Sequence, residues 1–345
     1  MSSGKRLACV LLGAACLIGG GIAVMSQQRS QFAEDRQPPG WPSDVKAVAF
    51  DGARAMRYLK QVCDIGPRIS GTEGMKKQVA LLEKHFADLG AQVELQRFSA
   101  RQRSQRQPVA MVNLIARWHP DRQRRLIICS HYDTRPMADQ ERDRRDWHKP
   151  FISANDGGSG VAFLMEMAHQ MKELPLQVGV DFVLFDGEEY IFDNTPEEQG
   201  GDMYFFGSLH FANEYNAARR KNPPRPTYVE AVLLDMIAGK QPQFRVEGHS
   251  YLQAGKLVEK IWNIAGEVNA PAFVREYGQN VRDDHLALLE VGIPAIDIVP
   301  TGSSNTDQFM VYPYWHRLGD VPENCAPDGM EQIARVLGVW MQRAR

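Results

Sequence analysis

The apolar run at residues 182–185 constrains this chain most, because it stops abruptly at Asp186-Gly187-Glu188-Glu189. A short, continuous apolar run that ends in a polar turn is typical of a strand buried on both faces, as in a parallel sheet. In open α/β sheets, ligands bind beyond the carboxyl ends of the strands. The adjacent carboxylates of Glu188 and Glu189 are therefore candidates for chemistry, one at a metal and the other at a substrate proton. A solvated acidic turn is the alternative interpretation.

The rest of the chain alternates between helical and strand-like patterns. Apolar residues recur at helical spacing in residues 53–62, 79–86, 161–168, 206–215, 252–268 and 330–341, and strand-like runs occur at residues 93–98, 109–118, 126–129, 231–234 and 293–299. The polar residues 99–107 fit a hairpin loop, and the charged residues 134–150 predict a longer loop. Thr72 and Ser159 are candidate helix caps. The pattern predicts an α/β fold, a single domain with a central mixed, mostly parallel sheet flanked by helices.

The N-terminal region differs from the rest in composition. Lys5 and Arg6 precede a mostly apolar stretch, residues 7–25, which predicts that residues 1–25 are an export signal or an N-terminal membrane anchor. Residues 26–44 are polar and contain two adjacent prolines, which is typical of a linker. Residues 45–345 are then the catalytic domain. We expect the protein to be exported, either membrane-anchored and facing the periplasm or extracellular side, or secreted.

Charge and cysteine usage exclude two classes of function. The net charge of -2 gives no basic footprint, so we expect no nucleic-acid partner. Five cysteines occur, of which Cys9 and Cys16 fall in the apolar N-terminal stretch. No Cys-x-x-Cys or Cys-His spacing is present, so a zinc site built from thiolates is not expected. Cys129 lies in a strand-like run, where a buried, inert thiol is the usual interpretation.

Imidazoles and carboxylates stand at the ends of the predicted strands. His131, the Glu188-Glu189 pair, Asp235 and His316 each follow a strand, and Asp156 precedes a helix. Nitrogen and oxygen ligands without thiolates suit a catalytic Zn²⁺ that keeps an open coordination position. Each residue also has an ordinary interpretation: a structural histidine for His131, a helix cap for Asp156 and a solvated strand end for Asp235. The recurrence of such residues at strand ends favours a metal centre.

The motifs around these residues resemble the zinc aminopeptidases of clan MH, peptidase family M28, and within them the glutaminyl-peptide cyclotransferases. The similar stretches are Ser130-His-Tyr-Asp133, Ala154-Asn-Asp-Gly-Gly-Ser-Gly160, Phe185-Asp-Gly-Glu-Glu189, Phe206-Gly-Ser208, Leu233-Leu-Asp-Met-Ile237, Arg282-Asp-Asp-His285 and Trp315-His316. They run in the same order from about residue 65 to the C-terminus. The resemblance implies a zinc-exopeptidase-like fold and an enzyme that acts on the N-termini of peptides or proteins.

Roles carry over by motif position. The resemblance implies that Asp156, Glu189 and His316 hold the main zinc and that Glu188 is the acid/base. In two-metal aminopeptidases, His131 and Asp235 would complete a second site that Asp156 bridges. In the cyclases one zinc is used, and the positions of Asp235 and Asp283 form a hydrogen-bond network beside the substrate.

Three features favour the cyclase branch over the aminopeptidases. Trp315 precedes His316, as in cyclases, where this tryptophan lines the pocket for the glutamine side chain. The Arg282-Asp-Asp-His motif and the run after Leu233 are also more similar to cyclases. Departures from the cyclase pattern are Arg282 in place of glutamine, the absence of a tryptophan shortly after the Glu-Glu pair, and the absence of the cysteine pair of vertebrate cyclases. The alternatives are a two-zinc aminopeptidase and, more remotely, a non-catalytic binding ectodomain.

Overall fold

The computed structural model describes residues 41–219 and 226–345 of the chain. Residues 42–345 form one unit, and the predicted signal or anchor at residues 1–25 lies outside the described residues. The helices are α2 (Gly52–Cys63), α3 (Glu73–Asp88), α4 (Gly158–Met167), α5 (Phe206–Ala218), α6 (Gly248–Glu267), α7 (His285–Glu290) and α8 (Asp328–Arg343). The strands are β1 (Gln92–Ala100), β2 (Val109–Trp118), β3 (Arg124–His131), β4 (Gly179–Phe185), β5 (Thr227–Leu234), β6 (Phe244–Val246), β7 (Phe273–Tyr277) and β8 (Ala295–Ile298).

The central sheet is mixed and mostly parallel, which confirms the predicted fold class. Its six strands lie in the order β1-β2-β4-β3-β5-β8. The predicted hairpin is β1 and β2, paired antiparallel, and β2 also runs antiparallel to β4. Strands β4, β3, β5 and β8 are mutually parallel. Because the chain goes from β3 to β4 on one side and then to β5 on the other, the strand order reverses beside β3, where α/β sheets form ligand crevices.

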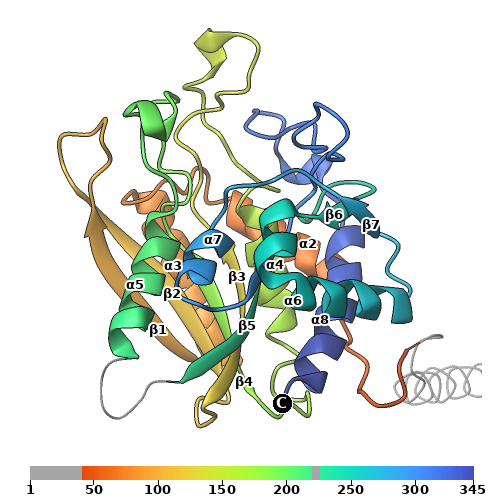
Figure 1. Ribbon diagram of the computed structural model, residues 1–345. Coiled ribbons are helices and arrows are strands. Elements are labelled where there is room, and N and C mark those ends of the chain that lie inside the picture. The colour runs from red at the N-terminus through yellow and green to blue at the C-terminus, as the bar shows by residue number, and fades with distance from the viewer. Residues whose placement is uncertain (1–40, 220–225) are drawn as a thin grey trace, which may run out of the picture. The chain divides into compact units, whose positions relative to one another are not determined.

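Helices cover both faces of this sheet (Figure 1). Helices α5 and α7 pack on one face over a buried apolar cluster that includes Ile127, Cys129, Val183, Phe185 and Leu233. On the other face α4 packs against β3, with α2 and α3 beside α4. Alternate side chains of the strands therefore enter two cores, which explains the near-continuous apolar runs. Cys129 is fully buried, and burial raises the pKa of its thiol well above the usual range, as expected for an inert cysteine.

One predicted helix cap is confirmed and the other is wrong. The Thr72 hydroxyl accepts a hydrogen bond from the Met75 N–H at the start of α3. At α4 the cap is Gly157, with φ 77° and no side-chain hydrogen bond, so Ser159 lies inside the helix. Its hydroxyl instead donates to the Asn155 carbonyl and accepts from the Ile237 N–H, 3.0 Å away. Ser159 thus connects α4 to the turn that follows β5.

Two further features differ from the sequence prediction. Strands β6 and β7 form a separate two-stranded sheet that the sequence patterns do not indicate. The predicted loop at residues 134–150 is exposed mainly in its second half, whereas most of residues 134–139 are buried.

Within residues 41–219 and 226–345, no helix combines the length and the apolar character needed to cross a membrane.

Candidate metal centre

The candidate site lies beyond the carboxyl ends of β3, β4 and β5. His131 is the last residue of β3, Glu188 and Glu189 follow β4, and Asp235 follows β5. Gly187 adopts φ 78°, a conformation that glycine reaches without strain, and it allows the tight turn after β4. The carboxylate of Asp133 accepts hydrogen bonds from the N–H groups of Glu188 and Glu189, both at 3.1 Å. The short β4 turn therefore presents both glutamates toward the same site.

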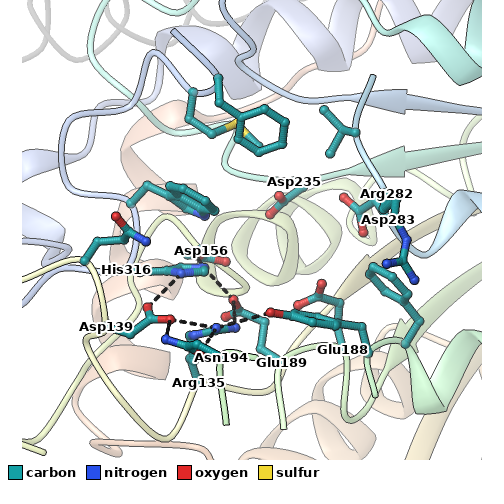
Figure 2. Close-up of a pocket in the computed structure, with 17 residues that line it drawn as sticks. Arg135, Asp139, Asp156, Glu188, Glu189, Asn194, Asp235, Arg282, Asp283 and His316 are labelled. Carbon is teal, nitrogen blue, oxygen red and sulfur yellow. Dashed lines mark hydrogen bonds and ion pairs between the residues drawn. The ribbon is translucent and has the colours of Figure 1, made fainter. Parts of the chain in front are cut away.

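Three residues from distant parts of the chain converge as candidate zinc ligands. Nε2 of His316 lies 2.7 Å from Oε1 of Glu189 and 3.6 Å from Oδ2 of Asp156 (Figure 2). Tetrahedral zinc with bonds of about 2.0 Å keeps its ligand atoms about 3.3 Å apart, which lies between these two separations. Oδ2 of Asp156 and Oε2 of Glu189 are buried without a hydrogen-bond partner. Unpaired buried carboxylate oxygens of this kind fit a bound cation.

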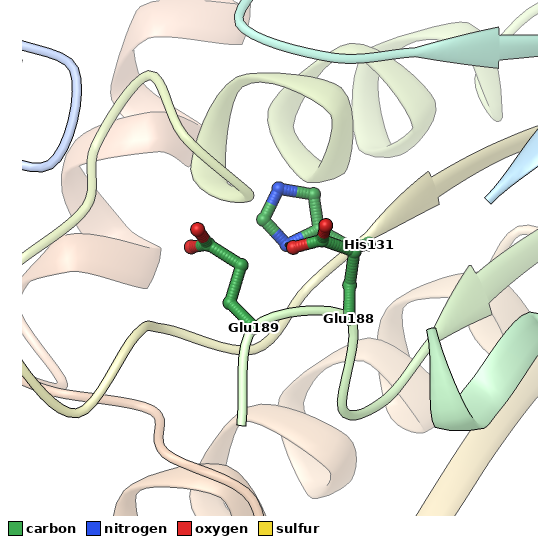
Figure 3. Close-up of side chains that lie close together, drawn as sticks. All are labelled: His131, Glu188 and Glu189. Atoms are coloured by element: carbon green, nitrogen blue, oxygen red, sulfur yellow. The ribbon is translucent and has the colours of Figure 1, made fainter. Parts of the chain in front are cut away.

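A second group of candidate ligands adjoins the first. Nε2 of His131 lies 3.1 Å from Oδ1 of Asp156 and 3.4 Å from Oδ1 of Asp235. Asp156 thus has one oxygen toward each group, as a bridging ligand would. His131 also lies near Glu188 and Glu189, with Nδ1 3.8 Å from Oε2 of Glu188 (Figure 3). The geometry accommodates either one cation or two.

The electrostatics of the site reflect a concentration of buried acids. Burial raises the pKa of Asp156 to about 7, and the adjacent charge of Glu189 adds to this effect. Burial and Glu189 also raise the pKa of Glu188 well above its usual range. Burial alone would raise the pKa of Glu189, but His316 and Arg135 lower it to about 2. The charge of Glu189 is thus stabilised, whereas that of Glu188 is costly and its carboxyl group holds a proton readily.

Two aspartates outside the candidate ligand set, Asp320 and Asp139, contact the backbone or the side chains of candidate ligands. The Asp320 carboxylate accepts hydrogen bonds from the N–H groups of Asn155 and Asp156, at 2.8 and 3.1 Å, and from the Tyr312 hydroxyl. Oδ1 of Asp139 lies 3.0 Å from Nδ1 of His316. Partners of this kind orient metal ligands and tune their basicity.

These residues border a pocket of about 360 Å³. Figure 2 shows the acids on its floor, with the His316 ring beside Asp156 and with Asp235 and Asp283 along another wall. Trp315 lines the pocket next to His316, with ring centroids 4.3 Å apart, and Phe309 packs 5.8 Å from Trp315. Arg282 lies at the margin, where it pairs with Glu197 at 2.8 Å. The pocket thus combines an aromatic wall with a carboxylate-rich floor.

The structure brings together every residue that the sequence singled out. Seven line the pocket, namely Asp156, Glu188, Glu189, Asp235, Asp283, Trp315 and His316, and His131 lies within 4 Å of three of them, Asp156, Glu188 and Asp235. Sequence reasoning missed Arg135, Asp139, Asn194 and Tyr204, which also line it. Arg135 and Asp139 could have been found from the neighbouring pair Met137-Ala138, because apolar residues within a charged loop indicate burial.

Comparisons with known proteins identify the family of this chain. The model of peptidase family M28 matches residues 113–341. A glutaminyl cyclase from Fimbriiglobus ruber is 50% identical in sequence, with a TM-score of 0.82 over 90% of this chain and 100% of that one. A Zn-dependent exopeptidase from Parabacteroides distasonis is 27% identical, with a TM-score of 0.76 over 87% of this chain and 100% of that one.

A curated relative is more distant. The glutaminyl-peptide cyclotransferase of Bothrops jararaca is 24% identical over 254 residues, which make up 66% of this chain and 64% of the snake protein. The chain thus spans just under two thirds of that relative's length. The family match and the 50% identical neighbour together assign the chain: it belongs to peptidase family M28, in the glutaminyl-cyclase-like branch of that enzyme family.

Proposed function

We propose that this protein is a zinc-dependent glutaminyl-peptide cyclotransferase, which converts an N-terminal glutamine to pyroglutamate and releases ammonia. The observation that carries the proposal is the convergence of Asp156, Glu189 and His316, with ligand atoms within 4.8 Å of one another, on the floor of a pocket that Trp315 and Glu188 also line. The 50% identity to a glutaminyl cyclase supports the cyclase branch.

The reaction needs an electrophile and a proton carrier. Zinc held by Asp156, Glu189 and His316 would supply Lewis-acid polarisation of the γ-carboxamide carbonyl. Glu188 would accept a proton from the substrate's own α-amine as its nitrogen bonds to the carbonyl carbon of the γ-carboxamide. The same carboxyl group would then deliver a proton to the amide nitrogen as the carbon–nitrogen bond breaks, so that ammonia leaves. A group that exchanges protons twice needs a pKa near the working pH, and the raised pKa of the buried Glu188 suits this task.

Asp235 and Asp283 are proposed to bind and orient the α-amine. Both line the pocket on the side away from His316 (Figure 2). Burial, and then the charge of Asp235, raise the pKa of Asp283 well above its usual range, so the Asp283 carboxyl group holds a proton readily. A protonated carboxyl group can donate one hydrogen bond and accept others, which suits a group that orients an amine. Trp315 is proposed to form the wall against which the glutamine side chain lies.

A two-zinc aminopeptidase is the second candidate function. The observation that favours it is the group of His131, Asp156 and Asp235, which could hold a second cation that shares Asp156. Glu188 would then activate a water molecule for attack on the first peptide bond. The Parabacteroides distasonis protein, named a Zn-dependent exopeptidase, has the same fold, but at 27% identity it is less similar to this chain than the cyclase.

Mass spectrometry of two reactions separates these functions. The purified protein is incubated with a glutamine-initiated peptide and, separately, with the same peptide initiated by leucine. We expect loss of ammonia from the first peptide with its chain otherwise intact, and no change in the second. An N-acetylated glutamine peptide is the control, because its blocked amine cannot attack. Shortening of either peptide by one residue would contradict the proposal in favour of the aminopeptidase.

We also propose that residues 1–25 direct export, followed by a linker at residues 26–44 and a catalytic domain at residues 45–345. The support is the charge and apolar pattern of the N-terminal residues. Cell fractionation of the full chain and of a chain that begins at residue 45 provides the test. Recovery of both chains in the cytoplasm would contradict export.

A further inference from the structure

Three consecutive residues of the segment 135–141 contact the loop that carries His316. Oδ1 of Asp139 lies 3.0 Å from Nδ1 of the His316 imidazole. The Gln140 N–H donates to the His316 carbonyl at 3.1 Å, and the Glu141 carboxylate accepts from the Leu318 N–H at 2.9 Å. One segment, far from the histidine in the sequence, therefore hydrogen-bonds the backbone of His316 and places the Asp139 carboxylate at ion-pair distance from its ring.

Arg135 connects this segment to Glu189, the glutamate among the candidate zinc ligands. Its side chain is 2% exposed, and Nη2 donates to Oδ2 of Asp139 at 2.8 Å and to Oδ1 of Asn194 at 3.1 Å. Nη1 lies 3.4 Å from Oε1 of Glu189. The Asn194 amide donates to the same Asp139 oxygen at 2.7 Å. One oxygen of Asp139 is thus fixed by two donors while the other faces His316, as Figure 2 shows.

His316 requires such support because its backbone is strained. Its φ is 51°, in the left-handed region that non-glycine residues rarely adopt. Residues held in this region persist only where surrounding contacts over-determine them, and they concentrate at functional sites. The imidazole can also carry its hydrogen on either nitrogen, and a group bonded to one nitrogen decides which one faces a metal. Both the position and the tautomer of His316 thus depend on its contacts.

We propose that Arg135 and Asp139 are positioning residues, which hold His316 with Nδ1–H toward Asp139 and with the Nε2 lone pair toward Asp156 and Glu189, and thereby set the affinity of the centre for zinc. Neither residue exchanges a proton with the substrate in this proposal. Arg135 acts by fixing Asp139 and also contacts the ligand Glu189, whereas Asp139 acts by fixing the ring. The inference rests on the proposed zinc centre but not on the choice between cyclase and aminopeptidase.

Zinc affinity, measured by competition with a chromogenic chelator, tests the pair. Loss of a partner that orients a metal-bound histidine weakens metal binding by roughly 10- to 100-fold. We expect a loss in this range for Asp139→Ala and for Arg135→Met. Asp139→Asn keeps an acceptor oxygen for Nδ1–H, so we expect it to lose less than Asp139→Ala. The matched control is Asp143→Ala, in the same loop, where the side chain contacts Arg145 rather than His316. Its zinc affinity should equal that of the unaltered protein.

A second measurement does not depend on the folding of any variant. Nitrogen NMR of the zinc-loaded, unaltered protein should show one imidazole with hydrogen on Nδ1 and metal on Nε2, assigned to His316 by its loss in His316→Ala. Hydrogen on Nε2, or zinc affinity unchanged in folded Asp139→Ala and Arg135→Met, would overturn the inference while leaving the proposed centre in place. If the unaltered protein binds no zinc, the proposed function fails and this inference fails with it.

Discussion

The carboxylates of Glu188 and Glu189 are adjacent in the chain but have different neighbours: Oε1 of Glu189 lies 2.7 Å from Nε2 of His316, and Oε2 of Glu188 lies 3.8 Å from Nδ1 of His131. The tight turn at Gly187 and the hydrogen bonds that the Glu188 and Glu189 N–H groups donate to Asp133 fix the backbone of both residues. The two glutamates should therefore respond differently to the same chemical change.

Glu188→Gln should abolish turnover while the protein still binds zinc. An amide cannot accept the proton from the attacking amine, and general acid–base catalysis typically contributes about 10²- to 10⁴-fold. We expect ammonia release from a glutamine-initiated peptide to fall by at least about 100-fold, with the zinc content of the purified protein unchanged. Activity close to that of the unaltered protein would remove Glu188 from its proposed role.

Glu189→Gln should cost the metal itself. The change removes the charge of a proposed ligand and leaves His316 without its close carboxylate partner. Mutation of a residue that only orients a metal ligand typically lowers metal affinity by roughly 10- to 100-fold. Loss of the charge of a ligand itself should therefore lower zinc affinity by at least about 100-fold. Chelator competition on the purified variant measures it, with Glu188→Gln as the matched comparison. Equal affinities in the two variants would be inconsistent with the ligand assignment.

The sequence allowed much of this site to be predicted, for a physical reason. Parallel strands end at a common edge, so His131, Glu188 and Asp235 could be expected near one another from the strand pattern alone. The pattern also singled out Asp156 before a helix and His316 after the last strand. Because His316 lies well beyond the end of β8 and Asp156 precedes α4, the motif resemblance was needed to assign them to the same site. Trp315 was likewise assigned to the pocket by motif resemblance, because it directly precedes His316.

The remaining parts depend on contacts that no local pattern encodes. Arg135 and Asp139 lie in a charged, non-periodic loop, and their burial follows from packing against residues near position 316. Strands β6 and β7 pair only through tertiary context. Ser159 is a residue type that often caps helices, but Asp320 holds the turn before α4 so that Gly157 is the N-cap. The Ser159 hydroxyl then accepts a hydrogen bond from the Ile237 N–H. In each case a long-range contact decides the structure.

His131→Ala separates one metal from two. If the protein is a one-zinc cyclase, His131 only supports Asp156 and Asp235, and we expect one zinc per chain before and after the change. Turnover should then fall by no more than roughly tenfold, the lower end for a residue that acts through its neighbours. Elemental analysis and ammonia release measure the two quantities. Two zinc ions in the unaltered protein, with one ion and all activity lost in the variant, would favour the aminopeptidase.

Glu247 should make stability depend on pH below about 5. Burial alone would raise its pKa, but the nearby His285, the Ser250 hydroxyl and the Val281 N–H lower it to about 2. Because the folded-state pKa lies below the unfolded value of 4.5, the stabilisation is present above that value and is lost as the pH falls toward 2. It amounts to at most about 3 kcal/mol at neutral pH. The contact with Val281 also holds the segment that leads to Arg282 and Asp283.

Urea unfolding of Glu247→Gln at several pH values tests this expectation. The variant should be less stable at pH 7 and should lose less further stability between about pH 5 and 3 than the unaltered protein. Glu83→Gln, at an exposed position in α3, is the control and should follow the unaltered protein throughout. Parallel curves for Glu247→Gln and the unaltered protein would show that the burial of Glu247 does not govern acid stability.

Gly157→Ala should damage the fold and the metal centre together. Gly157 adopts φ 77°, and an added Cβ would lie 2.7 Å from the Asp133 carbonyl oxygen and 2.8 Å from Cε1 of His131. Left-handed strain costs about 1–3 kcal/mol, and relief of the two contacts must shift the preceding residue, Asp156. We expect unfolding free energy to fall by that amount and zinc affinity to fall as well. Gly266→Ala, where an added Cβ meets nothing within 4 Å in helix α6, should keep its zinc affinity and gain helix propensity. If both variants bind zinc equally well, the turn at Gly157 is not what places Asp156.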